Sequence, residues 1–367
     1  MKVGLLTSSR ADYGIYLPLL EKLKSDPFFN LEIIAFGTHL SKFNGFTLQE
    51  IKKKNYKKIH TISTLITNDD EQSIATSYGL TSLKFADFWA NNHYDVVFCL
   101  GDRFEMSAAV QAGIPFGVKF AHIHGGETTL GAIDNIYRHQ ITLASFLHFT
   151  SSEVYKNKIT NLIGENKNIF SVGSLSLDEV HHFKPIEKTK FYVKFNIPDT
   201  EYALVTFHPE TVKVDKNNYF ASEMQQALKE ISKILHIVIT MPNADTLGSV
   251  YRMELEELKN KIPNRLTLIE NFGKNNYFSA MHYAKILIGN TSSGIIEAAS
   301  FDKYVINVGD RQKGRAQSKN IIDTDFKALE IIKKTKQTLK LGLFSGENIY
   351  YKFGAADNII KVLKNKK

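Results

Sequence analysis

Short hydrophobic runs alternate with amphipathic stretches along the whole chain. In the first half, helical patterns such as 15–25 and 76–91 separate hydrophobic runs at residues 2–7, 31–36, 95–100, 117–123, 146–150 and 169–172. Apolar runs of this length are typical of buried parallel strands. Strands that alternate with helices predict an open sheet with helices on both faces. The first half therefore predicts one doubly wound α/β domain.

The pattern breaks at HHFKPIEKTK, residues 181–190, where a proline and mixed charges end the periodicity. It restarts with hydrophobic runs near 202–207, 235–240, 265–269, 285–288 and 304–307, and with helical patterns near 217–233, 250–261 and 292–300. A chain of 367 residues is long enough for two domains, each with its own core. We expect one domain over 1–182 and a second over 190–350, with a ligand cleft between them.

Composition and charge exclude several classes of protein. The net charge is +8, but the lysines are spread over helical segments such as 51–58, 329–340 and 361–367. That distribution is typical of solvated helix faces rather than of a nucleic-acid interface. A basic surface would still attract a polyanionic small molecule. We therefore expect a small anionic ligand and no nucleic-acid partner.

Neither secretion nor membrane insertion is indicated. The N-terminal sequence MKVGLLTSSRADYG is interrupted by Arg10 and Asp12, and it predicts a first strand rather than a signal peptide. No apolar run approaches the roughly 20 residues that span a bilayer. The single cysteine, Cys99, lies in an apolar run and has no partner for an internal disulfide. We expect a cytoplasmic protein that has no membrane partner.

Charged residues gather just after two of the predicted strands. GDRFE follows the run that ends at residue 100, and HGGETTLGAIDNIYRH follows the run that ends at residue 123. In open α/β sheets, ligands bind beyond the carboxyl ends of the strands, so these residues should meet a substrate. The candidates are Asp102, His124, Glu127, Asp134 and Arg138.

Several of these residues also have a structural explanation. Asp102 could be a turn residue after a glycine, and Asp134 could be a helix N-cap. Glu127 follows a glycine pair, which would let the backbone approach a ligand. His122 and His124 alternate on one strand, a spacing that metal ligands can have. We nevertheless expect no metal.

The second half has an anion site of its own. The strand KILIG runs into NTSSG and then into a helical pattern, so Ser292, Ser293 and Gly294 lie at a helix N-terminus. Free backbone amides and the helix dipole bind phosphate there. Ordinary N-capping is the structural alternative, because serine and threonine are preferred caps.

Four further residues would complete a nucleotide site. Glu297, about one helical turn later, could accept hydrogen bonds from ribose hydroxyls while the serines hold phosphate. Arg311 and Arg315 lie in GDRQKGR, and Arg10 follows the first strand. Guanidinium groups bind phosphate oxygens bidentately, so three arginines from different loops suit a diphosphate.

These motifs together resemble a known family. The motifs are SSRADYG, GDRFE, HIHGGE with a later acid and RH, FHPET, and GNTSSGIIEA with GDRQKGR. They resemble those of the hydrolysing UDP-N-acetylglucosamine 2-epimerases of bacterial sialic and legionaminic acid synthesis. The resemblance follows the family's order over almost the whole chain. It implies two Rossmann-like domains in the glycosyltransferase-B arrangement. It also implies a C-terminal helix, 351–367, that packs back on the first domain.

The resemblance also implies roles for single residues and no cofactor. Asp102, Glu127 and Asp134 would transfer protons, and His208 of FHPET would lie near the leaving phosphate, although a lone histidine at a strand end is usually structural. The UDP-sugar would be bound by a larger set: Arg10, His124, Arg138, Phe272, Gly273, Ser292, Ser293, Gly294, Glu297, Arg311 and Arg315. Phe272 and Gly273 stand where the family holds the uracil.

Three positions depart from the wider pattern. Non-hydrolysing relatives carry a glutamate at the position of His124 and a lysine at that of Ile15, so both differences agree with the hydrolysing branch. Asn135 stands where many members have a second acid beside Asp134. We therefore assign no proton transfer to residue 135.

The implied reaction converts UDP-N-acetylglucosamine and water to N-acetylmannosamine and UDP, by anti elimination to a glycal and then hydration. One group must remove a proton from C2, and another must donate a proton to the opposite face of C2. Carboxylates that lie close together shift each other's pKa values apart, so one can act as the acid while another acts as the base. UDP-N,N′-diacetylbacillosamine is the alternative substrate. A glycosyltransferase and a non-catalytic UDP-sugar-binding protein are the alternatives of other classes. We expect a homo-oligomer, either a dimer or a tetramer.

Overall fold

The computed structural model describes residues 1–42, 46–66, 68, 70–130, 133–210, 213–241 and 248–366. The chain divides into two compact units. Unit 1 comprises Met1–Glu127, Asp134–His181 and Tyr350–Lys367, and unit 2 comprises Thr128–Ile133 and His182–Ile349. Each unit has a parallel sheet and a core of its own.

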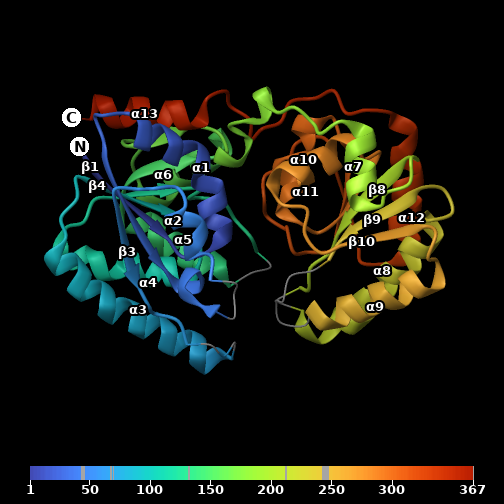
Figure 1. The fold of residues 1–367 in the computed structure, drawn as a ribbon, viewed down its shortest axis with the longest axis horizontal. Helices are drawn as coiled ribbons and strands as arrows, with labels where there is room; N and C mark the ends of the chain where they lie inside the picture. The colour runs from blue at the N-terminus through green and yellow to red at the C-terminus, as the bar shows by residue number, and fades with distance from the viewer. Residues whose placement is uncertain are drawn as a thin grey trace. The chain divides into compact units, whose positions relative to one another are not determined.

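The described part of unit 1 has one seven-stranded sheet in the order β3-β2-β1-β4-β5-β6-β7 (Figure 1). Its neighbouring strands run parallel. The strands are β1 (Lys2–Thr7), β2 (Asn30–Phe36), β3 (Lys58–Ile62), β4 (Val96–Leu100), β5 (Phe120–Ile123), β6 (Ser145–Thr150) and β7 (Ile169–Ser171). The order reverses between β1 and β4, and ligands of such sheets bind beside this point.

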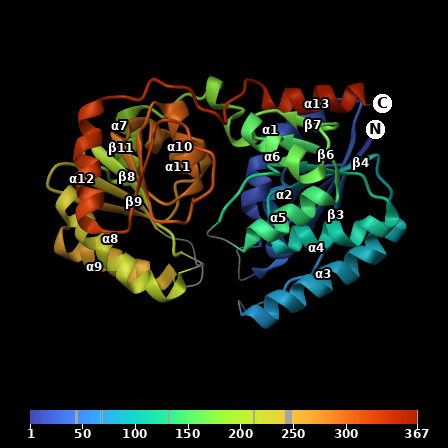
Figure 2. The ribbon, with the colours of Figure 1, turned by 180° about the vertical axis from the view of Figure 1, so that it is seen from behind.

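Helices cover both faces of this sheet, because its central strands bury side chains on both sides. They are α1 (Arg10–Ser25), α2 (Leu48–Lys52), α3 (Glu71–Asn91), α4 (Phe104–Gly113), α5 (Asp134–Leu143), α6 (Glu153–Ile163) and α13 (Ala355–Asn365). On one face, Leu5 and Phe98 pack with residues of α1, α2 and α13. On the other, Val97 and Cys99 pack with residues of α3, α4 and α5. Of these helices, α3 and α4 lie side by side (Figure 2).

The last helix of the described chain belongs to unit 1. Ala355, Ala356, Ile359 and Leu363 of α13 are buried in the same core as the residues of α1. The connection leading to α13 is also tied to this unit, since Ser174 donates its backbone N–H to the Tyr350 oxygen at 2.8 Å. Unit 1 is therefore assembled from three separate segments of the chain.

Within its described residues, unit 2 has a six-stranded parallel sheet in the order β10-β9-β8-β11-β12-β13. The strands are β8 (Tyr202–Thr206), β9 (His236–Thr240), β10 (Leu266–Ile269), β11 (Ile286–Gly289), β12 (Val305–Val308) and β13 (Ile321–Thr324). The helices are α7 (Lys188–Phe195), α8 (Asn217–Ile231), α9 (Gly248–Lys261), α10 (Lys274–Tyr283), α11 (Ser292–Ile296) and α12 (Ala328–Thr338). The reversal here falls between β8 and β11.

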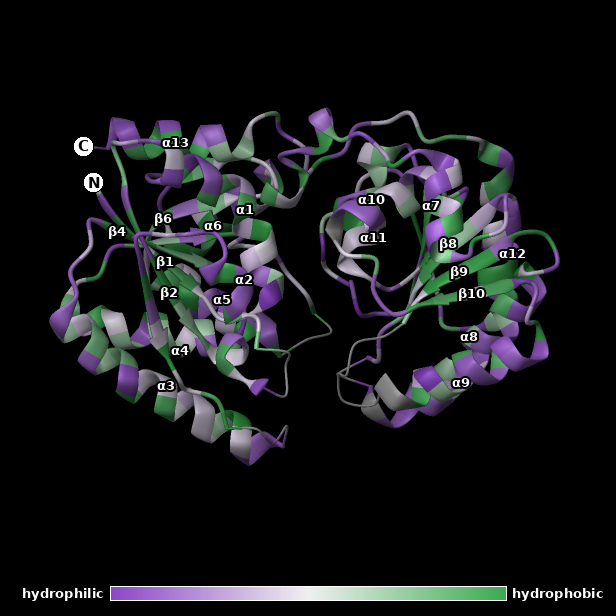
Figure 3. Ribbon diagram, in the orientation of Figure 1, coloured by the Kyte–Doolittle hydropathy of each residue, from purple (hydrophilic) through white to green (hydrophobic). Residues whose placement is uncertain are grey.

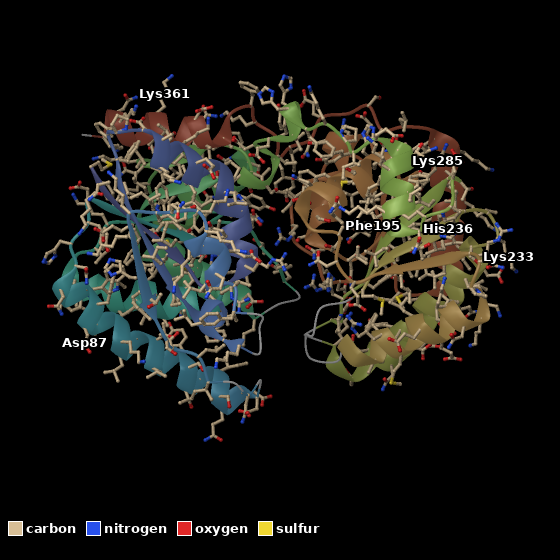
Figure 4. All side chains as sticks on the ribbon, viewed as in Figure 1. Asp87, Phe195, Lys233, His236, Lys285 and Lys361 are labelled. Atoms are coloured by element: carbon tan, nitrogen blue, oxygen red, sulfur yellow. The ribbon has the colours of Figure 1, made fainter. Side chains whose placement is uncertain are left out.

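The strands of both sheets are mainly hydrophobic (Figure 3). Val205, Ile237 and Ile288 belong to a core shared with α8, α9 and α12. Phe191 and Phe195 of α7 form an aromatic cluster with Phe272, with ring centroids 5.9 and 4.7 Å from that of Phe272. Phe195 is labelled in Figure 4.

The structure confirms the prediction of two Rossmann-like α/β folds, but two strands were not predicted. β3 and β13 form one edge of each sheet, and their residues are largely half-buried or exposed. Edge strands carry polar residues that a central strand excludes, so their sequences lack a continuous hydrophobic run. Among the described residues, no helix is both long and apolar enough to span a bilayer.

Candidate functional site

Arg138 joins the two acidic segments of unit 1. Asp102 lies just after β4, and the Arg138 guanidinium, from α5, donates a hydrogen bond to its Oδ2. The same guanidinium donates to the His124 backbone oxygen at 2.7 Å and lies 3.9 Å from Glu127 Oε2. The side chains of Arg138 and Glu127 are each only 3% exposed. A buried cation needs such partners, so Asp102, His124 and Glu127 are held together at the carboxyl ends of β4 and β5.

Glu127 contacts groups from three elements. Ser151, just after β6, donates its hydroxyl to Glu127 Oε1 at 2.8 Å. His124 Nδ1 lies 3.8 Å from the same oxygen, and Arg138 lies on the side of Oε2. His124 has a φ of +63°, a conformation that is uncommon for residues other than glycine. The chain therefore turns sharply between β5 and Glu127.

His122 is occupied by hydrogen bonds within the core. Its Nε2 lies 2.9 Å from the Gly101 backbone oxygen and its Nδ1 lies 3.1 Å from the Thr142 hydroxyl. Burial lowers the pKa of His122 to about 3, so the ring is neutral at physiological pH. Among the described residues, no group of three or more His, Cys, Asp or Glu side chains is arranged to hold a metal ion. His122 therefore has a structural role beside Gly101, which precedes Asp102.

Asp134 is the first residue of α5 rather than the residue before it. Burial and the neighbouring Asp102 raise the pKa of Asp134 to about 6, against the opposing effect of Arg103 and Arg138. The Arg103 guanidinium is itself fixed by the buried Glu105, to which its Nε and one terminal nitrogen donate at 3.2 and 2.8 Å. A carboxyl group with a pKa near 6 exchanges protons readily close to neutral pH. The Asp134 carboxyl group therefore titrates close to neutral pH.

Arg10 is the first residue of α1 and lies at the carboxyl end of β1. Its side chain is largely exposed, with Nε 3.9 Å from Glu50 Oε2. The preceding turn is held by Asp12, which accepts hydrogen bonds from the Ser8 N–H at 2.7 Å and from the hydroxyls of Ser8 and Ser9. Arg10 is thus presented from a rigid turn.

In unit 2, the segment after β11 has the predicted order of strand, small residues and helix. Thr291 is the N-cap of α11, and its side chain accepts the Ser293 N–H. The capping alternative therefore applies to Thr291 and not to Ser292 or Ser293. The Ser293 hydroxyl lies 2.7 Å from that of Tyr277. Burial, and to a lesser extent the charge of Glu297 at the C-cap of α11, raises the pKa of Tyr277.

Asn290 connects this segment to His208, which follows β8. Its side chain accepts the His208 N–H and donates to the His208 oxygen, both at 2.8 Å. Burial, and to a lesser extent Arg311, lowers the pKa of His208 to about 4. The imidazole is therefore neutral at physiological pH, so in the unliganded protein it can donate a hydrogen bond but is not a cationic acid.

The loop after β12 is tied to the same two segments. Arg311 and Gln312 donate to the Asn290 backbone oxygen at 3.3 and 2.9 Å. Glu210 of FHPET accepts the Asp310 N–H at 2.7 Å. Arg315 lines a cavity of about 560 Å³ beside this loop. The carboxyl ends of β8, β11 and β12, which are neighbours in the sheet, thus carry one hydrogen-bonded set of loops.

Phe272 and Gly273 precede α10. The Phe272 side chain is buried in the aromatic cluster with Phe191 and Phe195, so it is not free to stack on a base. Gly273 has a φ of +69° and adjoins open space, since a Cβ there would meet no atom within 4 Å. Only the backbone at these two positions can contact a ligand.

Four residues that the sequence did not single out shape these sites: Ser151, Glu210, Asn290 and Gln312. Glu210 and Asn290 lie inside the motifs FHPET and GNTSSG. Asn290 directly follows β11, and Glu210 comes four residues after the end of β8, so both positions carry a usable signal. Ser151 also follows a strand but belongs to no motif. Its partner Glu127 is 24 residues away in the chain, so only the fold reveals the contact.

The fold and both sites define a class of protein. Two Rossmann-like units, one with clustered carboxylates and one with hydroxyl, glycine and arginine loops at the strand ends, are typical of enzymes that act on nucleotide-linked sugars.

Comparison with known proteins specifies this class. The family model described as UDP-N-acetylglucosamine 2-epimerase matches residues 21–364. The GDP/UDP-N,N′-diacetylbacillosamine 2-epimerase (hydrolyzing) of Campylobacter jejuni is 35% identical over 90% of this chain and 85% of its own. The polysialic acid biosynthesis protein P7 of Escherichia coli is 31% identical over 99% of this chain and 94% of its own. The crystal structure of UDP-GlcNAc 2-epimerase from Neisseria meningitidis bound to UDP-GlcNAc covers all of both chains, with a TM-score of 0.81 and 16% identity.

The chain belongs to the UDP-N-acetylglucosamine 2-epimerase family. The predicted activity, that of a hydrolysing UDP-sugar 2-epimerase, is confirmed. The structural likeness also confirms the predicted fold class.

Proposed function

We propose that this enzyme converts UDP-N-acetylglucosamine and water to N-acetylmannosamine and UDP, as a step toward a nonulosonic acid. The observation that carries the proposal is the Arg138 cluster, which gathers Asp102 and Glu127 near the proton-exchanging Asp134. A glycosyltransferase has no use for three carboxyl groups that can handle protons. Ser292, Ser293, Gly294, Glu297, Arg311 and Arg315 are proposed to bind the UDP moiety, with Arg10 at the diphosphate.

Inversion at C2 needs removal of the C2 proton, and because that hydrogen is only weakly acidic, the C1–O bond must break first to make it removable. In the first step, the C1–O bond to UDP breaks and UDP leaves with the electron pair. A base takes the C2 proton, and the C–H electrons form the C1–C2 double bond of a glycal. In the second step, water adds its hydroxyl to C1 and an acid donates a proton to the opposite face of C2. The products are UDP and the free 2-epimer.

The environments of the carboxyl groups suggest their roles. Asp134, with a pKa of about 6, is proposed to exchange the C2 proton, because a group with a pKa near the working pH transfers protons most effectively. Glu127 accepts a hydrogen bond and faces a guanidinium, so it is suited to remain anionic beside the positive charge that develops at C1. Asp102, paired with Arg138, would act on the other face of the ring.

Isotope labelling tests this route. In deuterated water, one deuterium should appear at C2 of the released sugar, because the second C2 proton comes from solvent. In oxygen-18 water, the label should appear on the anomeric oxygen and not on UDP, because the C1–O bond breaks. Proton NMR and mass spectrometry of products taken early in the reaction measure both. Retention of protium at C2, or label on UDP, would contradict the elimination.

A second substrate is supported by a specific finding. The Campylobacter jejuni relative, at 35% identity, is named for GDP/UDP-N,N′-diacetylbacillosamine. That sugar has a methyl group at C6 and a second acetamido group at C4. Incubation of the purified enzyme with each UDP-sugar, with UDP release followed over time, decides between the two. A larger kcat/KM for the bacillosamine derivative would replace the substrate proposed here.

UDP binding should change the protonation of His208. With a pKa of about 4, this imidazole is neutral in the free protein, and a bound diphosphate would favour the charged form and raise the pKa. We therefore expect UDP binding near pH 5 to take up more protons in the wild type than in His208→Asn, by up to roughly one proton per UDP. Titration calorimetry in two buffers of different ionisation enthalpy measures the difference, and the protons of UDP itself cancel. Equal uptake would place His208 away from the phosphates.

Three further properties stay predictions. We infer that the enzyme works in the cytoplasm, that it forms a dimer or tetramer and that it needs neither cofactor nor metal. Sedimentation at several protein concentrations checks the assembly. Activity after exhaustive treatment with a chelator checks the metal requirement.

A further inference from the structure

Glu127 is seated against the start of α6 by a turn that has no room for side chains. Gly126 has a φ of +76°, and a Cβ there would lie 2.7 Å from the Tyr155 backbone oxygen in the first turn of α6. A Cβ at Gly125 would lie 2.8 Å from His122 Nδ1. Any residue other than glycine would push the turn away from its neighbours. The turn therefore fixes the position of the Glu127 backbone.

The Glu127 side chain is then held by contacts from each element packed against it. From the β6–α6 junction, the Ser151 hydroxyl donates to Oε1 at 2.8 Å. From the same loop, His124 Nδ1 lies 3.8 Å from Oε1, and from α5, Arg138 lies 3.9 Å from Oε2. Lys158 of α6 is close enough for Glu127 to oppose the lowering of its pKa by burial. The Ser151 bond is the shortest of these contacts.

We propose that Ser151 is a positioning residue of the epimerase reaction, whose hydroxyl fixes the orientation of the Glu127 carboxylate and favours its anionic form. The inference rests on the role proposed above for Glu127. A glutamate carboxylate rotates easily about its last side-chain bond. With Oε1 fixed by Ser151, Oε2 stays on the side of Arg138.

The neighbouring residue provides a matched control. Ser152 is as buried as Ser151 and occupies the N-cap position of α6, where it makes no capping hydrogen bond with its side chain. Its hydroxyl has no hydrogen-bond partner among the described residues. Loss of the Ser152 hydroxyl removes a buried polar group of the same kind without touching Glu127.

The test compares Ser151→Val with Ser151→Thr, because valine and threonine have nearly the same shape and differ by the hydroxyl. Ser151→Ala and Ser152→Ala complete the set. For each, kcat and KM for UDP release are measured across pH, and the Kd for UDP is measured by calorimetry. The comparison of Ser151→Val with Ser151→Thr remains informative if Ser151→Ala does not fold, because valine and threonine contact the same neighbouring atoms.

Ser151→Val and Ser151→Ala should lower kcat by roughly 10- to 100-fold, the weight of a hydrogen bond to a charged group. The acidic limb of the kcat profile should move to higher pH, because the anionic carboxylate has lost a donor. The Kd for UDP should stay within about threefold of the wild type in these variants. Ser151→Thr should restore kcat and the profile, and Ser152→Ala should behave as the wild type.

Two results overturn the proposal. One is a Ser151→Val enzyme with the kcat and pH profile of Ser151→Thr, and the other is a Ser152→Ala enzyme with the same loss as Ser151→Ala. Either result would leave the wild-type reaction, and hence the proposed function, intact. A wild-type enzyme that releases UDP from neither sugar would refute the proposed function itself.

Discussion

Glu127→Gln and Asp102→Asn should each lower turnover by roughly two to four orders of magnitude, because Glu127 would stabilise the developing positive charge and Asp102 would act as an acid–base group. Both substitutions keep the shape of the side chain but remove the charge that faces Arg138. The affinity for UDP should stay within about threefold, because neither Glu127 nor Asp102 is among the groups proposed to hold UDP. Stopped assays of UDP release and calorimetry with UDP measure the two quantities.

The exposed Glu153, also at the start of α6, offers a control for this prediction. Glu153→Gln should leave both turnover and UDP affinity at the wild-type level. Near-normal turnover in Glu127→Gln or in Asp102→Asn would remove that residue from the mechanism. A large loss of UDP affinity in either variant would instead mean that the residue acts in binding.

Gly289→Ala should destabilise unit 2 by about 3 kcal/mol or more, and binding of UDP should be lost with it. Gly289 ends β11 with a φ of +147°, and a Cβ there would lie only 1.8 Å from the Thr206 backbone oxygen of β8. Relief of this overlap must separate two central strands, which costs more than ordinary overpacking of about 1–3 kcal/mol. Thermal and chemical unfolding measure the change.

The matching substitution is Gly79→Ala in the middle of α3, where a Cβ would meet no atom within 4 Å. Because alanine favours helix over glycine, this variant should be neutral or more stable by up to about 1 kcal/mol. A Gly289→Ala protein as stable as the wild type would show that the β8–β11 junction can open without cost.

Much of the fold could be predicted because the central strands are buried on both faces. The predicted run at 2–7 coincides with β1, and the runs near 146–150 and 202–207 differ from β6 and β8 by one residue at one end. β3 and β13 escaped prediction because these two edge strands are largely half-buried or exposed and have no continuous hydrophobic run. The other two edge strands, β7 and β10, have short apolar runs and were predicted near 169–172 and 265–269.

The candidate site was predictable to the extent that its residues follow strands. Asp102 and Glu127 were predicted because the carboxyl ends of parallel strands lie on one edge of a sheet, whereas His208 was predicted from the FHPET motif of the family. Contacts between such ends are set by strand order, which the sequence does not show. The bond from Ser151 to Glu127 and those from Asn290 to His208 therefore required the structure.

The charge state of a histidine was equally hidden in the sequence. The FHPET motif suggests a histidine near the phosphate but not its charge; burial, and to a lesser extent Arg311, keeps His208 neutral in the free protein. In the sequence, Arg311 stands 103 positions away from His208. Burial and nearby charge depend on tertiary packing, so pKa values follow from the fold and not from the motif.

The way the chain is divided between its units sets an order for folding during synthesis. The segment 182–349, almost all of unit 2, leaves the ribosome before α13 does. Ile359 and Leu363 of α13 pack in the same core as α1, so this core, which contains the residues translated first, is completed only when the last helix has been synthesised. Domains usually fold as they emerge, from the N-terminus onward. Here the second unit can finish first, and until then α1 exposes apolar surface that a chaperone would recognise.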